Sequence, residues 1–251
     1  MRNSVWGALS ALLMAGSASA AQPRTAPMVL TDHERGREIP VQVYFPGEHN
    51  DCVARATCPV AFFSPGYGIP HTRYSFLTNN LAEQGYLVVA VQHDLPSDPP
   101  LVGKGDLVVV RTPAWKRGAA NLRFVKTELT RFLPDYQWSN LTLLGHSNGG
   151  DISSLLLTTS PEFAARLVTL DHRRVALPRD ASISVLSIRG SDFEADDGVL
   201  PSETENASRR ICVVEIPGSR HNDMFDGGPS QLKIDINSLI DPFMRQGSCE
   251  R

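Results

Sequence analysis

The chain has 251 residues, a formal net charge of −3 and 41% hydrophobic residues, which suits one domain with a full hydrophobic core. No basic cluster breaks this mildly acidic balance, so nothing in the composition indicates nucleic-acid binding. After residue 20 no stretch approaches the ~20 apolar residues that a transmembrane helix requires, so we expect no stable membrane insertion.

The first 20 residues have the three parts of a secretory signal peptide. Arg2 supplies the positive start, Val5–Gly16 the apolar run, and Ala18-Ser19-Ala20 a cleavage site of small residues. We therefore expect an exported protein, periplasmic or extracellular, whose mature form is a single domain of residues 21–251.

Four cysteines lie in the mature chain, namely Cys52, Cys58, Cys212 and Cys249. An even number in an oxidising compartment indicates two disulfide bonds, with free thiols as the alternative. We favour Cys52–Cys58 across a short loop and Cys212–Cys249 between a late strand and the C-terminal tail. No Cys/His spacing suits zinc, so we expect no metal site.

The first half of the mature chain predicts an antiparallel start followed by strands buried on both faces. Met28–Leu30 and Ile39–Phe45 flank a polar turn, and the second run alternates apolar and polar residues as a half-buried strand does. Pro59–Phe63 and Tyr86–Val91 are continuously apolar, as buried parallel strands are. Between these two runs lies a helical stripe that Gly85 closes, formed by Tyr74, Leu77 and Leu81.

The second half alternates helices with strands. One helix is stopped by Pro134, another by Ser160-Pro161, and in the last helix we expect Pro242 to end or kink the chain. The first of these helices has the stripe Leu122, Val125, Leu129 and Phe132, and the last has Leu232, Ile236, Leu239, Ile240 and Phe243. Further strands are expected from Leu141, and at Leu167–Leu170, Ile183–Ile188 and Ile211–Ile216.

This alternation predicts an α/β fold, with a mostly parallel sheet, helices on both faces and an antiparallel start. The longest connections could not house a separate cap domain of ordinary size. We therefore expect a single domain with an open site.

The most informative stretch is Gly145-His146-Ser147-Asn148-Gly149, a Gly-x-Ser-x-Gly pattern between a strand and a helix. With almost no loop between those elements, the serine must adopt a strained backbone conformation, and the glycines remove Cβ atoms that would clash. The turn lifts the Ser147 hydroxyl above the N-terminus of the helix. This context favours Ser147 as a nucleophile over a purely structural turn.

A serine hydroxyl needs an adjacent base, which in a sheet of this kind lies after a strand and downstream of the nucleophile. Only His172 and His221 follow Ser147, and His221 lies in the loop directly after the last strand. If His172 were the base, no strand-end acid would remain between it and the serine, so we predict His221. For His93 and the adjacent Asp94 we expect a structural or rim role.

The acid that orients His221 is left open by the spacing. We call the Gly-x-Ser-x-Gly turn, Gly145–Gly149, the elbow. Asp171 ends the strand after the elbow and Asp192 ends the next strand. Asp196 and Asp197 follow in the same loop as Asp192. Each of these aspartates precedes His221 and could orient an imidazole.

An oxyanion hole needs two backbone N–H groups that face the developing charge. We expect one from Asn148, next to the nucleophile. The other should come from Tyr67, because the loop after Pro59–Phe63 reads Gly66-Tyr67-Gly68 and permits a close backbone approach.

Three segments carry a family resemblance: Phe62–Gly68, Thr72–Ser75 and Leu81–Tyr86, supported by Gly145–Gly150, Leu170-Asp171 and Gly218–His221. Together they resemble the α/β-hydrolases around platelet-activating-factor acetylhydrolase, with parts shared by cutinase-like polyester hydrolases and dienelactone hydrolases. The resemblance implies the α/β-hydrolase fold and an acid after the first strand beyond the elbow, hence Asp171. It keeps Asp192 as the alternative, or Asp197 if the spacing to Pro201 is the guide. Asn148 and Pro65 depart from the residues usual in that group.

These residues predict an exported serine hydrolase that acts on carboxylic esters, with a small-molecule or lipid-like substrate and no cofactor. Acyl transfer or amide hydrolysis could use the same machinery. From another class, an inactive hydrolase fold used for binding would predict a broken triad, and no required residue type is missing. Nothing in the sequence indicates an oligomeric state.

Overall fold

A computed structural model describes residues 23–47, 58–208 and 210–247. The expected signal peptide lies outside these residues, and so do Cys52 and Cys249. Neither Cys58 nor Cys212 is a free thiol, but the expected pairing involves the two undescribed cysteines and stays a prediction. Across the described ranges, no helix combines the length and hydropathy of a membrane span.

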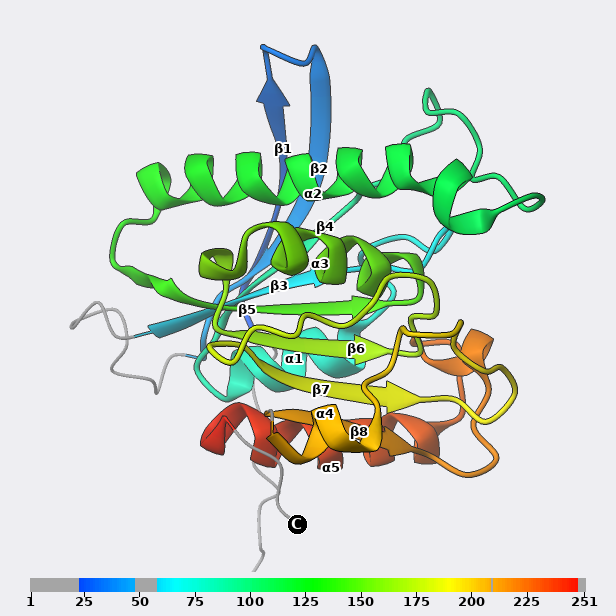
Figure 1. Cartoon of the computed structure of the whole chain (residues 1–251). Coiled ribbons are helices and arrows are strands. Elements are labelled where there is room, and N and C mark those ends of the chain that lie inside the picture. The colour runs from blue at the N-terminus through cyan, green and yellow to red at the C-terminus, as the bar shows by residue number, and fades with distance from the viewer. Residues whose placement is uncertain (1–22, 48–57, 209, 248–251) are drawn as a thin grey trace, which may run out of the picture.

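The described residues form one eight-stranded sheet with the order β1-β2-β4-β3-β5-β6-β7-β8 (Figure 1). β2 pairs antiparallel with β1 and with β4, and all the later pairings are parallel. The strands are β1 Thr25–Asp32, β2 Arg37–Tyr44, β3 Cys58–Ser64, β4 Leu87–Val91, β5 Tyr136–His146, β6 Arg166–Leu170, β7 Ser184–Arg189 and β8 Ile211–Glu215. The antiparallel start and the parallel remainder are as the apolar patterns predicted.

Helices cover both faces of the sheet (Figure 1). α2 and α3 contribute Leu122 and Ile152 to a core on one face, and α1 and α5 contribute Leu77 and Ile236 to a core on the other. The α-helices are α1 Ser75–Glu83, α2 Leu107–Phe132, α3 Asn148–Thr159, α4 Glu203–Ser208 and α5 Ser230–Gln246, and short 3₁₀ helices span Pro161–Phe163 and His221–Asp223.

α2 is longer than its apolar stripe indicated. It begins at Leu107, where the Asp106 carboxylate caps the N–H groups of Val108 and Val109, and it continues through Pro113. The expected stripe also included Phe132, which is 63% exposed and does not face the core. The first half of α2 was missed because its apolar residues do not form a continuous stripe.

Pro242 does not end the last helix. α5 continues to Gln246 and stops where Gly247 adopts a left-handed conformation with φ of 69°. Of the two expected outcomes, an end or a kink at Pro242, the structure excludes the end. The buried stripe on both sides of this proline, including Ile240 and Phe243, keeps the helix packed on the sheet.

Candidate active site

The Gly-x-Ser-x-Gly segment forms a sharp turn from β5 into α3. Ser147 lies between them with φ of 51° and ψ of −118°, a conformation that costs energy in a residue with a side chain. Its N–H donates to the Leu170 carbonyl oxygen (2.8 Å), which ties the turn to the end of β6. Within residues 141–150, Ser147 is the one residue that is not buried. The turn therefore presents the hydroxyl to solvent from an otherwise closed segment.

The glycines around Ser147 are required by contact. A Cβ atom on Gly145 would overlap the Gly149 backbone, and one on Gly149 would overlap the carbonyl oxygen of Ser64 at the end of β3. A Cβ on Gly150 would lie 2.6 Å from the Cβ of His172. These close contacts pack the start of α3 against the ends of β3 and β5 and against His172, which lies just after β6.

Three side chains predicted from the sequence meet at the carboxyl edge of the sheet. His221 Nε2 lies 2.9 Å from Ser147 Oγ, and His221 Nδ1 lies 2.5 Å from Asp171 Oδ2. Asp171 follows β6 and is fully buried, while His221 is 6% exposed in the segment after β8, where it begins the 3₁₀ helix His221–Asp223. A carboxylate on Nδ1 favours the tautomer with its proton there, so Nε2 is free to accept the serine proton.

Asp171 is held as a carboxylate. It adopts φ of 47°, its Oδ1 accepts the Gly190 N–H (3.0 Å), and Arg189 Nη2 lies 2.9 Å away as an ion pair. Burial opposes ionisation, but the hydrogen bond with His221 and the charge of Arg189 outweigh it and lower the pKa of Asp171. The acid therefore stays charged where an imidazolium would form.

The other candidate acids have different partners. Asp192 Oδ1 accepts the backbone N–H of His221 (2.8 Å), so this carboxylate contacts the histidine loop rather than the imidazole. Asp196 pairs with Arg174, and Asp197 is exposed. Of the four aspartates, Asp171 is the one with a hydrogen bond to the His221 ring.

Two further histidines are buried in structural positions. His172 Nε2 contacts the Val175 carbonyl oxygen (3.1 Å), and His93 Nε2 contacts Ser64 Oγ (2.9 Å). Burial, followed by the charges of nearby arginines, lowers the pKa of each to about 3. His93 is therefore a neutral residue of the interior, and the adjacent Asp94 is half-buried.

The expected oxyanion donors lie on two different elements. Asn148 is the first residue of α3, so its N–H has no acceptor within the helix, and its side-chain Oδ1 accepts the Trp115 indole N–H (2.9 Å). Tyr67 is 44% exposed in the loop after β3, where its hydroxyl accepts the Leu101 N–H (3.0 Å). Asn148 directly follows the serine, and Gly66, the residue before Tyr67, lies against His146, the residue before the serine.

Sequence reasoning did not find three residues beside these groups. Arg189 pairs with Asp171, Trp115 fixes the Asn148 side chain, and the Phe193 ring meets His221 edge to face at 6.0 Å. Trp115 lies in the unpredicted half of α2. Arg189 and Phe193 lie within three residues of Asp192, which the sequence had marked as a candidate acid. Their nearness to Asp192 along the chain was the one indication that they lie close to the site.

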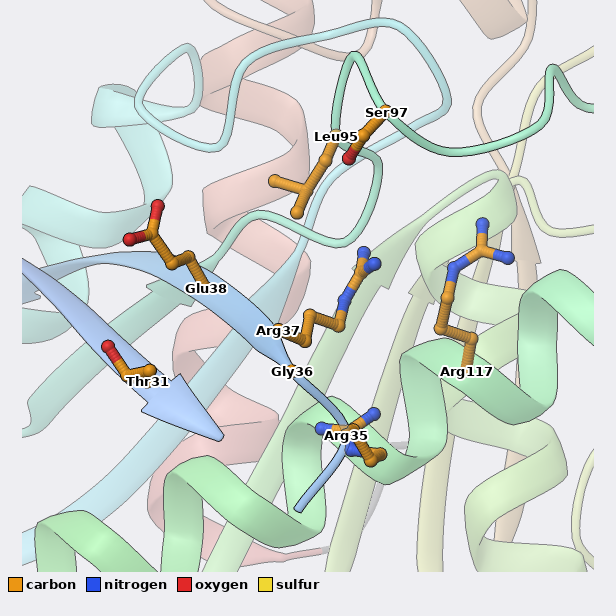
Figure 2. A pocket seen from close by; sticks show the side chains of 8 residues that line it. All are labelled: Thr31, Arg35, Gly36, Arg37, Glu38, Leu95, Ser97 and Arg117. Atoms are coloured by element: carbon orange, nitrogen blue, oxygen red, sulfur yellow. The ribbon is translucent and has the colours of Figure 1, made fainter. Parts of the chain in front are cut away.

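A pocket of about 640 Å³ lies between the β1–β2 turn, the loop after β4 and α2 (Figure 2). Its arginines are paired with carboxylates: Arg37 Nη1 lies 2.7 Å and Arg117 Nε 3.4 Å from Asp98, and Arg35 Nε lies 2.5 Å from Asp32. None of Ser147, His221 and Asp171 lines it. Elsewhere too, the described side chains include no group of three or more potential metal ligands.

No protein-family model and no curated protein sequence matches the chain. Solved structures do match it. A Klebsiella pneumoniae protein assigned as a dienelactone hydrolase superposes with a TM-score of 0.64 at 18% identity, covering 89% of this chain and 99% of that one. A ferulic acid esterase from Streptomyces cinnamoneus gives 0.57 at 18% identity, covering 91% and 81%.

A third solved structure is described as an α/β serine hydrolase without a lid, from Xanthomonas campestris. It gives a TM-score of 0.57 at 18% identity and covers 90% of this chain and 96% of that one. At such identities the likeness is one of fold, and it covers 89% to 91% of this chain and 81% to 99% of the three neighbours.

Proposed function

We propose that this chain, which has the α/β-hydrolase fold, is an exported serine hydrolase that cleaves carboxylic esters. The observation that carries the proposal is the series of contacts from Ser147 Oγ through the His221 imidazole to Asp171, at 2.9 Å and 2.5 Å. A nucleophile, a base and an orienting acid in this order form the constellation that activates a serine.

In the first half of the reaction, Ser147 Oγ attacks the ester carbonyl carbon while its proton moves to His221 Nε2. Asp171 stabilises the imidazolium, and Arg189 keeps the acid charged. The N–H groups of Asn148 and Tyr67 hold the negative oxygen of the tetrahedral intermediate. As the intermediate collapses, the bond to the alcohol oxygen breaks and His221 returns its proton to that oxygen.

In the second half, water attacks the acyl-enzyme. His221 removes a proton from the water, a second tetrahedral intermediate forms, and the bond between the acyl group and Ser147 Oγ breaks. The proton on His221 then returns to Ser147, and the acid is released. No cofactor takes part in this sequence.

The proposal also includes the setting of the enzyme. Residues 1–20 have the pattern of a signal peptide, which supports export of residues 21–251 to the periplasm or the medium. The bonded state of Cys58 and Cys212 supports the pairs Cys52–Cys58 and Cys212–Cys249. The neighbour without a lid supports an open site that accepts small-molecule or lipid-like esters.

The test is hydrolysis of p-nitrophenyl acetate and butyrate by the mature protein and by two variants. Ser147→Ala should lose at least about 1,000-fold in kcat, because it removes the nucleophile. Ser154→Ala is the matched control, since Ser154 lies buried on α3, the helix that follows Ser147, and its hydroxyl has no hydrogen-bond partner among the described residues. Turnover by Ser147→Ala at the wild-type rate would reject the proposal.

A further inference from the structure

A chain of buried hydrogen bonds runs behind the reacting groups. The Gly66 N–H donates to the Tyr74 hydroxyl (3.0 Å), which lies 2.8 Å from His146 Nδ1, and His146 Nε2 lies 3.0 Å from the His221 carbonyl oxygen. A carbonyl oxygen only accepts, so His146 carries its proton on Nε2. His146 Nδ1 then accepts the proton of the Tyr74 hydroxyl, and every group has one defined role.

Both side chains are held in neutral forms by burial. Tyr74 is fully buried and His146 is 1% exposed. Burial, with the charge of nearby His221 next, lowers the pKa of His146 to about 3, and burial raises the pKa of Tyr74. Near neutral pH neither Tyr74 nor His146 is therefore ionised, so neither buried side chain needs a counter-charge.

Tight packing leaves the side chains of Tyr74 and His146 little room to move. A Cβ on Gly66 would lie 2.8 Å from His146 Nδ1, so only glycine lets the loop after β3 approach the imidazole this closely. The His146 ring lies 5.1 Å from the His221 ring and 5.8 Å from the Tyr74 ring. Tyr74 in turn packs on Phe63 of β3 at 4.4 Å.

The two ends of this series of hydrogen bonds, Gly66 and His221, lie in the two segments whose relative position matters for the proposed reaction. Gly66 precedes Tyr67, the expected oxyanion donor, and His221 is the expected base. His146 precedes the nucleophile and lies between them. A shift of about 1 Å between such groups can cost about a hundred-fold in rate.

We propose that His146 and Tyr74 are positioning residues, which fix the oxyanion loop and the His221 loop relative to Ser147. This inference rests on the proposed function, because it assigns a task within that reaction. Misplaced loops weaken contacts that form in the transition state more than they weaken substrate binding. Loss of the hydrogen bonds through Tyr74 and His146 should therefore lower kcat and leave KM nearly unchanged.

The test compares Tyr74→Phe with Tyr86→Phe. Tyr86 is also buried and donates its hydroxyl to a backbone oxygen, that of Met244 (3.2 Å), away from the reacting groups. Tyr74→Phe should lower kcat by between about ten-fold and a hundred-fold with KM within about two-fold, and Tyr86→Phe should keep kcat. The kcat is counted per site titrated with a fluorophosphonate, so that unfolded protein does not contribute.

A second pair of variants separates positioning from simple packing. His146→Gln keeps an N–H donor that can reach the His221 carbonyl oxygen, whereas His146→Leu keeps only volume. The kcat per titrated site should fall in the order wild type, His146→Gln, His146→Leu. Equal values for both variants, or wild-type kcat per site in Tyr74→Phe, would overturn the inference.

The nitrogen chemical shifts of the His146 ring supply a readout that does not depend on catalysis. They should report a neutral ring with its proton on Nε2 between pH 5 and 8. A proton on Nδ1, or a charged ring, would also overturn the inference. If the wild type neither reacts with the fluorophosphonate nor cleaves esters, the proposed function itself fails, and the assigned task fails with it.

Discussion

At the residue scale, Asp171 and Asp192 illustrate what sequence can and cannot distinguish. Both follow a strand, both precede His221, and both contact His221 in the structure. One accepts from the ring and the other from the backbone N–H of the same residue. Spacing along the chain predicts which edge of the sheet an acid reaches, but not which atom of its partner it faces.

Substitution of these two acids should separate their tasks. Asp171→Asn should lower kcat by about 10⁴, because an amide can stabilise the wrong imidazole tautomer and cannot balance the imidazolium. Asp192→Asn should cost less than about ten-fold, since an amide oxygen still accepts the His221 N–H. Steady-state kinetics on p-nitrophenyl butyrate measure both, and a larger loss in Asp192→Asn would contradict the assignment.

The sequence predicted that Ser147 and His221 meet at one edge of the sheet and that glycines flank the serine, because chain order and local geometry constrain both. It did not predict the partners of Asp171 and Asn148. Arg189 and Trp115 reach the site from the end of β7 and from α2, and neither has a short motif that marks it. Contacts of this kind depend on the packed tertiary arrangement.

At the element scale, periodicity predicted the strands and the cores of the helices but not all of their ends. Buried strands such as β4 read as unbroken apolar runs. The start of α2 was missed because Val108 and Val109 are exposed there, and Asp106 caps the helix instead of an apolar stripe marking it. Pro242 does not end α5, because the packing of Ile240 and Phe243 on either side of it outweighs its local effect.

The elbow should tolerate no side chain at Gly149. Gly149→Ala would place a methyl group on the Ser64 carbonyl oxygen and should lower the free energy of unfolding by about 1–3 kcal/mol. Gly103→Ala is the control, because its Cβ would meet no atom within 4 Å. Urea unfolding followed by tryptophan fluorescence compares them, and equal midpoints would show that the contact is not tight.

At the scale of the whole molecule, the alternation of strands and helices predicted the fold class and, for the residues that the structure describes, a single layered domain without a separate cap. The strand order, with β4 between β2 and β3, came from the structure. This order places the ends of β5, β6 and β7 side by side and so brings Ser147 and Asp171 into reach of one histidine. Sequence spacing suggested that they share an edge, and the sheet defines their distances.

The buried histidines should make the whole molecule sensitive to acid. His93, His146 and His172 each have a pKa lowered to about 3, so the folded chain stays unprotonated at sites that the unfolded chain protonates below about pH 6.5. Stability contributed by these three sites is therefore lost as the pH falls from 6.5 toward 3. As the pH falls from 7 to 5, each of the three sites should lower the free energy of unfolding by about 2 kcal/mol.

One buried acid works in the opposite direction. Burial raises the pKa of Asp151 to about 6 despite the Arg174 and Val175 N–H groups that it accepts, so protonation of the folded state near pH 5 restores about 1 kcal/mol. The histidines dominate this sum. Urea unfolding at the two pH values should show a loss of several kcal/mol at pH 5, and equal stability at both would contradict neutral burial of the imidazoles.

The central claim is that Ser147 is an activated nucleophile, and covalent labelling tests it most directly. The folded protein is incubated with a fluorophosphonate, digested and mapped by mass spectrometry. We predict one adduct per chain, located on Ser147. A folded protein that forms no adduct, or forms it on another residue, would contradict the claim.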